Sequence, residues 1–232
     1  MRAVLLAGGK GTRLYPYTAV FPKPLVPLGD KPIMEIFIRQ LKSFGFNHVT
    51  ICVGHLASLI KTFFKDGKWL GIKIDYSLEN EPLGTVGPLA LLNDLPETFL
   101  VANGDLLTTV DLSEMMKIHK RKGAILTVGI HKQERKIEWG VLEIKRDRIV
   151  GYSEKPTQKF YISAGVYILD KSVLKYLPKN KYFDFPQLVN LLIQKEKNIV
   201  PYNIRGYWLD IGRPDDYQKA LEEFSNRRNI FK

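Results

Sequence analysis

Apolar and polar positions follow two different patterns along this chain, and the change between them falls near residue 123. In the first part, nearly continuous apolar runs alternate with stretches in which apolar residues recur every three or four positions. Continuous runs are typical of strands buried on both faces, and the longer spacing is typical of amphipathic helices. The pattern predicts strands at residues 3–7, 48–53, 72–76 and 98–102, and helices at residues 31–44, 55–64 and 84–92.

Beyond residue 123 the pattern predicts strands with few helices between them, at residues 124–130, 140–144, 149–153, 160–169 and 207–211. Helices are predicted at residues 185–194 and 214–227. The alternation in the first part indicates a mostly parallel sheet with helices on both faces. We therefore predict an α/β, Rossmann-like fold with a β-hairpin insertion in the second half. We expect one domain over residues 1–232, with halves at 1–122 and 123–232.

Composition places the chain among ordinary globular proteins, with 45% hydrophobic and 25% charged residues. No apolar run reaches the roughly 18 residues of a membrane span. The chain passes directly from Met1 into its first strand, so we expect no signal peptide and a cytoplasmic location. Its one cysteine, Cys52, lies in an apolar run and is interpreted as a buried thiol, which suits a reducing compartment.

The net charge is +11, from 35 lysines and arginines against 24 aspartates and glutamates. The densest basic runs, residues 117–122 and 132–136, are interpreted as solvated surface, because no basic arm or aromatic-basic RNA signature accompanies them. We therefore expect no nucleic-acid partner. A diffuse positive field is also consistent with small anionic substrates.

Three glycines, Gly8, Gly9 and Gly11, follow the first predicted strand, and the cations Arg13 and Lys23 come after them. Glycine lets backbone N–H groups approach a ligand closely, so a glycine-rich turn after a buried strand suits phosphate oxygens. A tight turn with surface charges is the alternative interpretation. The turn matches neither the Walker A loop nor the Gly-x-Gly-x-x-Gly fingerprint.

Two aspartates, Asp105 and Asp210, lie in apolar surroundings where carboxylates are usually paired or metal-bound. If they face each other, they form a site suited to Mg²⁺, which uses one or two carboxylates plus substrate phosphates. A turn or helix-capping carboxylate is the alternative for each. Because ligands bind at the carboxyl ends of parallel strands, we expect the Gly8 turn, the Glu79 region and Asp105 to gather at one edge.

Other catalytic classes find little support in the sequence. The four histidines and the lone cysteine have no zinc-ligand spacing, and no Gly-x-Ser-x-Gly elbow is present. Glu154 and Lys155 follow one predicted strand, and Gly140 begins another. These three residues are candidates to contact a second anionic substrate, with an ordinary turn as the alternative.

Taken together, the motifs resemble those of the sugar-1-phosphate nucleotidylyltransferases, in the order that this family shows and over essentially the whole chain. The motifs are residues 6–14 (LAGGKGTRL), 22–25 (PKPL), 31–32 (KP), 81–85 (EPLGT), 103–105 (NGD), 154–156 (EKP) and 208–212 (WLDIG). The resemblance implies a glycosyltransferase-A-like nucleotidyltransferase fold. It also implies an enzyme that transfers a nucleoside monophosphate from a nucleoside triphosphate to a sugar 1-phosphate and releases pyrophosphate.

The resemblance implies roles for individual residues. Arg13, Lys23, Asp105 and Asp210 would be catalytic, and the two aspartates would bind Mg²⁺. The nucleotide would be bound by Leu6, Ala7, Gly8, Gly9, Gly11, Thr12, Arg13, Glu79, Gly84 and Thr85. The sugar phosphate would be bound by Asn103, Gly140, Glu154, Lys155 and Gly165. The nucleophile is already an anion, so positioning and charge stabilisation suffice without a general base.

The nucleobase and the sugar depend on finer features. Glu79 can accept hydrogen bonds from guanine N1–H and its 2-amino group, which favours GTP; a shift of two positions in the alignment would make Glu81 the reader. Residues 79–85 resemble the mannose-1-phosphate guanylyltransferase branch, so mannose or manno-heptose 1-phosphate is expected. Tyr15 instead resembles the thymidylyltransferases of the glucose branch. A glucose-1-phosphate thymidylyl-, uridylyl- or cytidylyltransferase is therefore the alternative.

A non-catalytic nucleotide-sugar-binding regulatory subunit is a further alternative. Such a protein would be expected to have lost Arg13, Lys23 or one of the aspartates, and all four are present. The chain does not include the left-handed β-helix that follows the catalytic domain in many relatives, which removes a common means of oligomerisation. We expect a monomer or a homodimer. Because no apolar run is long enough to span a bilayer, we expect no membrane partner.

Overall fold

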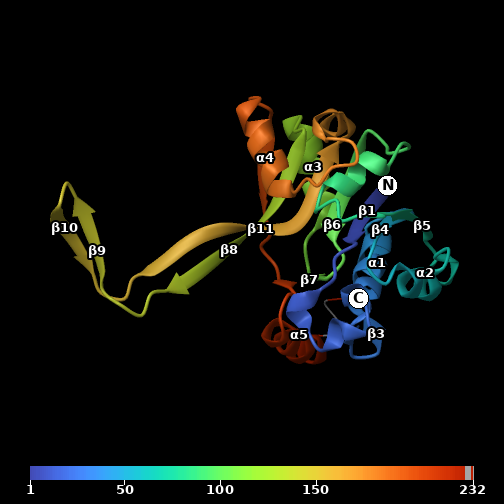
Figure 1. Ribbon diagram of the computed structural model, residues 1–232, viewed down its shortest axis with the longest axis horizontal. Coiled ribbons are helices and arrows are strands. Elements are labelled where there is room, and N and C mark those ends of the chain that lie inside the picture. The colour runs from blue at the N-terminus through green and yellow to red at the C-terminus, as the bar shows by residue number, and fades with distance from the viewer. Residues whose placement is uncertain (228–230, 232) are drawn as a thin grey trace.

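A seven-stranded sheet forms the centre of the computed structural model, which describes residues 1–227 and 231 (Figure 1). The strands are β1 (Arg2–Ala7), β2 (Pro27–Leu28), β3 (Lys31–Pro32), β4 (His48–Val53), β5 (Lys73–Leu78), β6 (Thr98–Asn103), β7 (Leu106–Thr108), β8 (Leu126–Lys136), β9 (Val141–Lys145), β10 (Arg148–Ser153), β11 (Thr157–Asp170), β12 (Ile199–Asn203) and β13 (Trp208–Asp210). The α-helices are α1 (Ile33–Ser43), α2 (Ala57–Phe64), α3 (Leu112–Lys122), α4 (Phe185–Gln194) and α5 (Pro214–Arg227).

The order of strands in the sheet is β12-β8-β11-β6-β1-β4-β5. Strand β1 is parallel to both β4 and β6, and β5 extends the parallel part beyond β4. Strand β11 runs antiparallel between β6 and β8, and β12 is parallel to β8. The predicted α/β fold with a parallel sheet and added hairpins is therefore confirmed.

Strand β1 shows why this sheet is buried on both faces. Its alternate residues Ala3, Leu5 and Ala7 pack in one apolar cluster with α1, α2 and α3. Val4 packs on the opposite face with residues of α4 and the 3₁₀ turn Gly87–Leu91. Because neighbouring residues of a strand point to opposite faces, only a continuous apolar run serves both clusters.

Most helices and strands predicted from periodicity are present, with differences of a few residues at their ends. Residues 84–92 form only the short 3₁₀ turn, because Gly84, Gly87 and Pro88 disfavour a longer helix. The sequence pattern missed α3 and β12. The basic run at residues 117–122 was predicted as surface; its lysines and its arginine are exposed on the last turns of α3, whereas His119 within it is buried.

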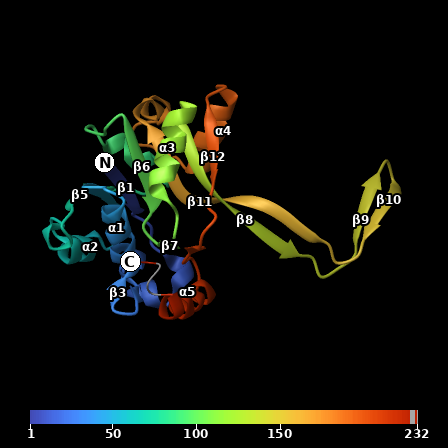
Figure 2. The same cartoon turned by 180° about the vertical axis from the view of Figure 1, so that it is seen from behind.

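The second half of the sheet carries a long projection. Strands β8 and β11 continue past the edge of the body as a paired ribbon, and β9 and β10 form a hairpin at its far end (Figures 1 and 2). We refer to residues 131–162 as the arm. None of these residues is buried.

Cys52 is fully buried in β4, as predicted, and burial raises the pKa of its thiol well above the usual range. Within the part of the chain that the structure describes, no helix combines the length and apolar character needed to cross a membrane.

The packing of α1 against the sheet leads to a stability prediction. Phe37 is 1% exposed and lies in the largest apolar cluster. Phe37→Ala should lower the free energy of unfolding by about 3–5 kcal/mol, because it removes buried area and leaves a cavity. Urea denaturation checks this value. Phe21→Ala is the matched control, since Phe21 is 55% exposed and its loss should change stability little. Equal effects of the two changes would contradict this account of the core.

Candidate active site

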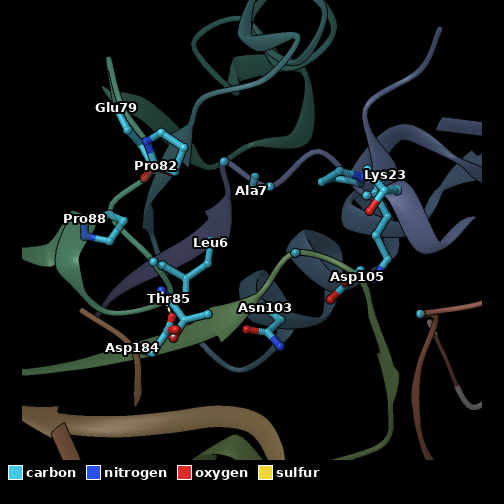
Figure 3. Close-up of a pocket in the computed structure, with 18 of the residues that line it drawn as sticks. Leu6, Ala7, Lys23, Glu79, Pro82, Thr85, Pro88, Asn103, Asp105 and Asp184 are labelled. Carbon is cyan, nitrogen blue, oxygen red and sulfur yellow. Dashed lines mark hydrogen bonds and ion pairs between the residues drawn. The ribbon is translucent and has the colours of Figure 1, made fainter. Parts of the chain in front are cut away.

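A cavity of about 410 Å³ opens at the carboxyl ends of β1 and β6. Its lining includes the Gly8 turn, Glu79 and Asp105, so the predicted gathering of these three segments at one edge is confirmed. The other side comes from residues far along the chain, including Asp184 before α4 and Asp210 at the end of β13. Figure 3 shows Glu79, Thr85 and Asp184 at one end of this pocket and Lys23 with Asp105 at the other.

The turn after β1 lies very close to the Glu79 side chain. A Cβ added to Gly8 would lie 1.6 Å from Glu79 Oε1, so only glycine fits here without displacing that carboxylate. The backbone holds Glu79 in turn, because its N–H donates to the Val53 carbonyl at 2.9 Å. The hydrogen bond to the end of β4 therefore holds Glu79 in position next to the Gly8 turn.

Glu79 is half-buried, and burial raises the pKa of its carboxyl group. Its Oε2 accepts a hydrogen bond from the Leu83 N–H at 3.0 Å. The other oxygen, Oε1, faces the Gly8 turn, and Glu79 lines the pocket. Glu81 is exposed and lies outside the pocket lining, so the pocket geometry favours Glu79 of the two candidate base readers.

Gly84 and Thr85 are held in the pocket wall by the start of α4. Asp184 Oδ1 accepts from the Thr85 N–H at 2.7 Å and from its hydroxyl at 2.9 Å. The Thr85 hydroxyl oxygen then accepts from the Phe185 N–H at 2.9 Å. This network joins the first half of the chain to the second and fixes the loop that follows Glu79.

At the opposite end of the pocket, Lys23 lies between Asp105 and Asp210. Lys23 Nζ forms an ion pair with Asp105 Oδ2 and lies 3.6 Å from Asp210 Oδ1. The side chains of Lys23 and Asp105 are only 11% and 16% exposed. Asp210 reaches this position because β13 pairs with β7, which directly follows Asp105. The prediction that Asp105 and Asp210 lie together is therefore confirmed.

The charges at this end are not balanced. Burial raises the pKa of Asp210, and the neighbouring Asp105 carboxylate raises it further, while Lys23 and Arg13 oppose both effects. Asp105 Oδ1 and Asp210 Oδ1 are both buried and accept no hydrogen bond, and Asp210 Oδ1 has only the 3.6 Å ion pair with Lys23. A buried carboxylate oxygen without a donor is costly, so these two oxygens are suited to a cation.

The donor set fits a hard divalent cation of the magnesium type. Such a cation takes one or two protein carboxylates and completes its shell with water and substrate phosphate oxygens. Among residues 1–227 and 231, no group of three or more acidic, histidine or cysteine side chains forms a closed metal site. Asp105 and Asp210 would therefore hold the cation only together with the substrate.

The remaining predicted residues fall into three groups. Leu6, Ala7, Gly9, Gly11, Thr12, Arg13 and Asn103 line the pocket. Gly165 lies behind Asn103: it has φ +69°, and a Cβ there would approach Asn103 Nδ2 to 2.6 Å. Gly140, Glu154 and Lys155 are exposed on the arm, outside the pocket lining (Figures 1 and 2). The structure does not bring these three residues to the chain's own pocket, and their role stays a prediction.

Three pocket residues, Pro88, Tyr182 and Asp184, lie in none of the motifs singled out from the sequence. Asp184 could have been found, because Asp-Phe-Pro-Gln at residues 184–187 is a helix-start signature and forms a capping box in the structure. Its contact with Thr85 spans 99 positions, and no local pattern indicates it.

Comparison with known proteins is consistent with this geometry. Residues 2–227 match the family model described as nucleotidyl transferase, and the chain belongs to that family. It is 34% identical over 253 residues to the UTP–glucose-1-phosphate uridylyltransferase of Synechocystis, covering 98% of this chain. It is 36% identical over 233 residues to the probable mannose-1-phosphate guanylyltransferase 1 of Oryza sativa, covering 95% of this chain. The chain spans 64% of the length of each of these two relatives.

A solved structure, described as HddC from Yersinia pseudotuberculosis complexed with GMP-PN, has the same fold. It superposes with a TM-score of 0.73 at 28% identity and covers 96% of this chain and 99% of that one. The predicted resemblance to sugar-1-phosphate nucleotidylyltransferases is confirmed at the level of the family.

The contact between Gly8 and Glu79 gives a testable prediction. In Gly8→Ala the new methyl group should displace the Glu79 carboxylate and weaken nucleoside triphosphate binding about tenfold, the effect of losing one hydrogen bond to a charged group. Calorimetric titration measures the affinity. Glu79→Ala supplies the control: if the methyl group acts by displacing the carboxylate, Gly8→Ala should weaken binding little further in a chain that already carries Glu79→Ala. A further tenfold loss in the double variant would show that the Glu79 contact is not responsible.

Proposed function

We propose that this chain transfers a nucleoside monophosphate from a nucleoside triphosphate, preferably GTP, to a sugar 1-phosphate, preferably mannose or manno-heptose 1-phosphate. The observation that carries the proposal is a single pocket whose lining holds the glycine turn together with Arg13, Lys23, Asp105 and Asp210. Family membership supports the reaction class. The name of the Oryza sativa relative supports GTP, and the name of the Synechocystis relative supports UTP.

The proposed reaction is an in-line displacement at phosphorus. A phosphate oxygen of the sugar 1-phosphate attacks the α-phosphorus, a new P–O bond forms, and the bond to the β-phosphate bridging oxygen breaks. The electron pair leaves with pyrophosphate. The nucleophile carries its own negative charge, so no side chain needs to remove a proton.

The pocket residues would act by holding and neutralising charge. The backbone of Gly8, Gly9 and Gly11 and the Arg13 guanidinium would hold the triphosphate. Lys23, already between two carboxylates, would meet the phosphate that is transferred. A divalent cation, which we propose to be Mg²⁺, would be held by Asp105 and Asp210 and would supply charge neutralisation for the phosphates.

Glu79 supports GTP as the donor. An ionised carboxylate only accepts hydrogen bonds, so it matches the two neighbouring N–H donors of guanine and offers nothing to uracil O2 or O4. A uridylyltransferase acting on glucose 1-phosphate is the second candidate, favoured by the Synechocystis relative. A non-catalytic nucleotide-sugar sensor is the third, and the presence of Arg13, Lys23 and both aspartates in one pocket opposes it.

Pyrophosphate release tests the reaction. The chain is assayed with GTP, UTP, CTP, dTTP and ATP, each with mannose, manno-heptose and glucose 1-phosphates. We expect the highest rate with GTP and a manno-configured sugar. Absence of pyrophosphate from every pair would overturn the enzymatic proposal and favour the sensor.

The aspartates should be essential to turnover. Asp105→Asn and Asp210→Asn should each lower pyrophosphate release about 100-fold or more, because each removes negative charge from the proposed cation site. EDTA should abolish turnover and Mg²⁺ should restore it. Asp66→Asn is the control, since Asp66 pairs with the exposed Lys68. Circular dichroism confirms folding, and near-normal activity of either aspartate variant would remove that residue from the site.

The base reader can be tested separately. Glu79→Gln should lower kcat/KM for GTP about 10- to 100-fold, because the amide places a donor against guanine N–H, and it should change UTP use little. Glu81→Gln is the matched control, because Glu81 is exposed outside the pocket. Parallel losses for GTP and UTP would exclude Glu79 as the reader, and an effect only at Glu81 would move the role there.

A further inference from the structure

The arm is an outlying part of a chain that is otherwise organised around one sheet. Its two long strands are held together by seven successive residue pairs, from Ser163–Ile130 to Thr157–Lys136. Both views show the β9–β10 hairpin standing clear of every other element (Figures 1 and 2). Bringing this hairpin back over the chain's own pocket would require the paired ribbon to bend sharply or to lose pairs.

One face of the hairpin is apolar. Ile144 is paired with Ile149, and Leu142 with Tyr152. Leu142 and Ile144 are two apart and share a face, and the bulge between Ile149 and Gly151 brings Ile149 and Tyr152 to the same face opposite them. These four side chains therefore lie together, and they are 47–66% exposed. A lone two-stranded hairpin is at best marginally stable in water, so this face needs a covering surface.

The exposed apolar area matches one partner's share of a stable dimer. Eight large apolar side chains of the arm are exposed: Trp139, Leu142, Ile144, Ile149, Val150, Tyr152, Phe160 and Tyr161. The four aromatic ones, at ~150–250 Å² each and 41–76% exposed, alone offer on the order of 500 Å², and the four aliphatic ones add to this. A standard interface buries about 800 Å² on each partner.

The pocket and the arm are complementary in charge. The pocket lining carries four carboxylates, Glu79, Asp105, Asp184 and Asp210, against the two cations Arg13 and Lys23. Lys23 is already engaged by Asp105. The arm carries eight lysines and arginines against five carboxylates, and its Lys155 is exposed and appears in none of the described ion pairs.

We propose that two copies of this chain exchange arms, so that the apolar face of each hairpin packs on the other copy and Glu154 and Lys155 complete the sugar-phosphate side of that copy's pocket. The inference rests on the proposed function for what the pocket binds. The exchange is reciprocal, so one two-fold axis closes the assembly and leaves no arm free.

The first test is the state of association. Sedimentation velocity of the full chain at 10–50 μM should show a dimer. Ile144→Glu with Ile149→Glu should give a monomer that still binds nucleoside triphosphate. Lys145→Gln with Arg148→Gln, the neighbouring pair on the opposite face, is the matched control and should stay dimeric. A monomeric wild-type chain, or a dimer that survives the two glutamates, would overturn the proposal.

The second test asks whether the arm works in the other copy's pocket. Arg13→Ala disables a pocket and Lys155→Ala disables an arm. The two variants are coexpressed with different affinity tags, and the mixed dimer is purified through both tags. Each variant alone should be inactive, and the mixed dimer should regain about half of the wild-type rate, because one of its two sites is complete.

These outcomes separate the two proposals. An active wild-type chain whose mixed dimer stays inactive would show that the arm serves its own pocket, and this would overturn the exchange while leaving the reaction intact. Full activity of Lys155→Ala alone would also overturn it. A wild-type chain that dimerises through the arm but releases no pyrophosphate from any pair would overturn the proposed function.

Discussion

The ion pair between Lys23 and Asp105, with Asp210 beside it, is the interaction on which the pocket depends. It joins the loop after β1, the turn after β6 and the end of β13. The first and last of these segments lie more than half of the chain apart. Lys23 and Asp105 are mostly buried, so each charge needs the other, and removing one partner would leave the other uncompensated. The pair therefore fixes the shape of the pocket as well as its charge.

The same interaction explains why the pocket suits phosphates only when further positive charge is present. Four carboxylates line it, and two of their buried oxygens accept no hydrogen bond. Lys23 cannot neutralise both aspartates and a phosphate at once. Asp105 and Asp210 would hold a divalent cation, which would offset the repulsion between the two carboxylates and supply positive charge for phosphate oxygens.

Periodicity predicted the parts of the fold in which local pattern and burial agree. Strand β1 and helix α1 were found because one is apolar on both faces and the other has a clear apolar stripe. Helix α3 was missed because its charged last turns dominate its composition, although Leu112, Met115 and Met116 are buried at helical spacing. The gathering of Gly8, Glu79 and Asp105 followed from strand direction alone. The Asp184–Thr85 contact did not, because long-range pairing leaves no local sequence signal.

The arm shows a different limit of sequence reasoning. Alternation predicted its strands, but the same alternation suits a hairpin that folds over its own pocket and one that extends from the body. The direction of the arm follows from the bulge between Ser163 and Tyr167, where β11 leaves the sheet. Beyond the bulge, β11 stays paired with β8 without a break, which keeps the arm extended. Three of the five residues expected to bind the sugar phosphate, Gly140, Glu154 and Lys155, lie on this arm, whereas the residues expected to bind the nucleotide lie at the sheet edge. In the proposed arrangement one chain supplies the whole nucleotide-binding side of the pocket, and sugar recognition depends on what covers the apolar face of the hairpin.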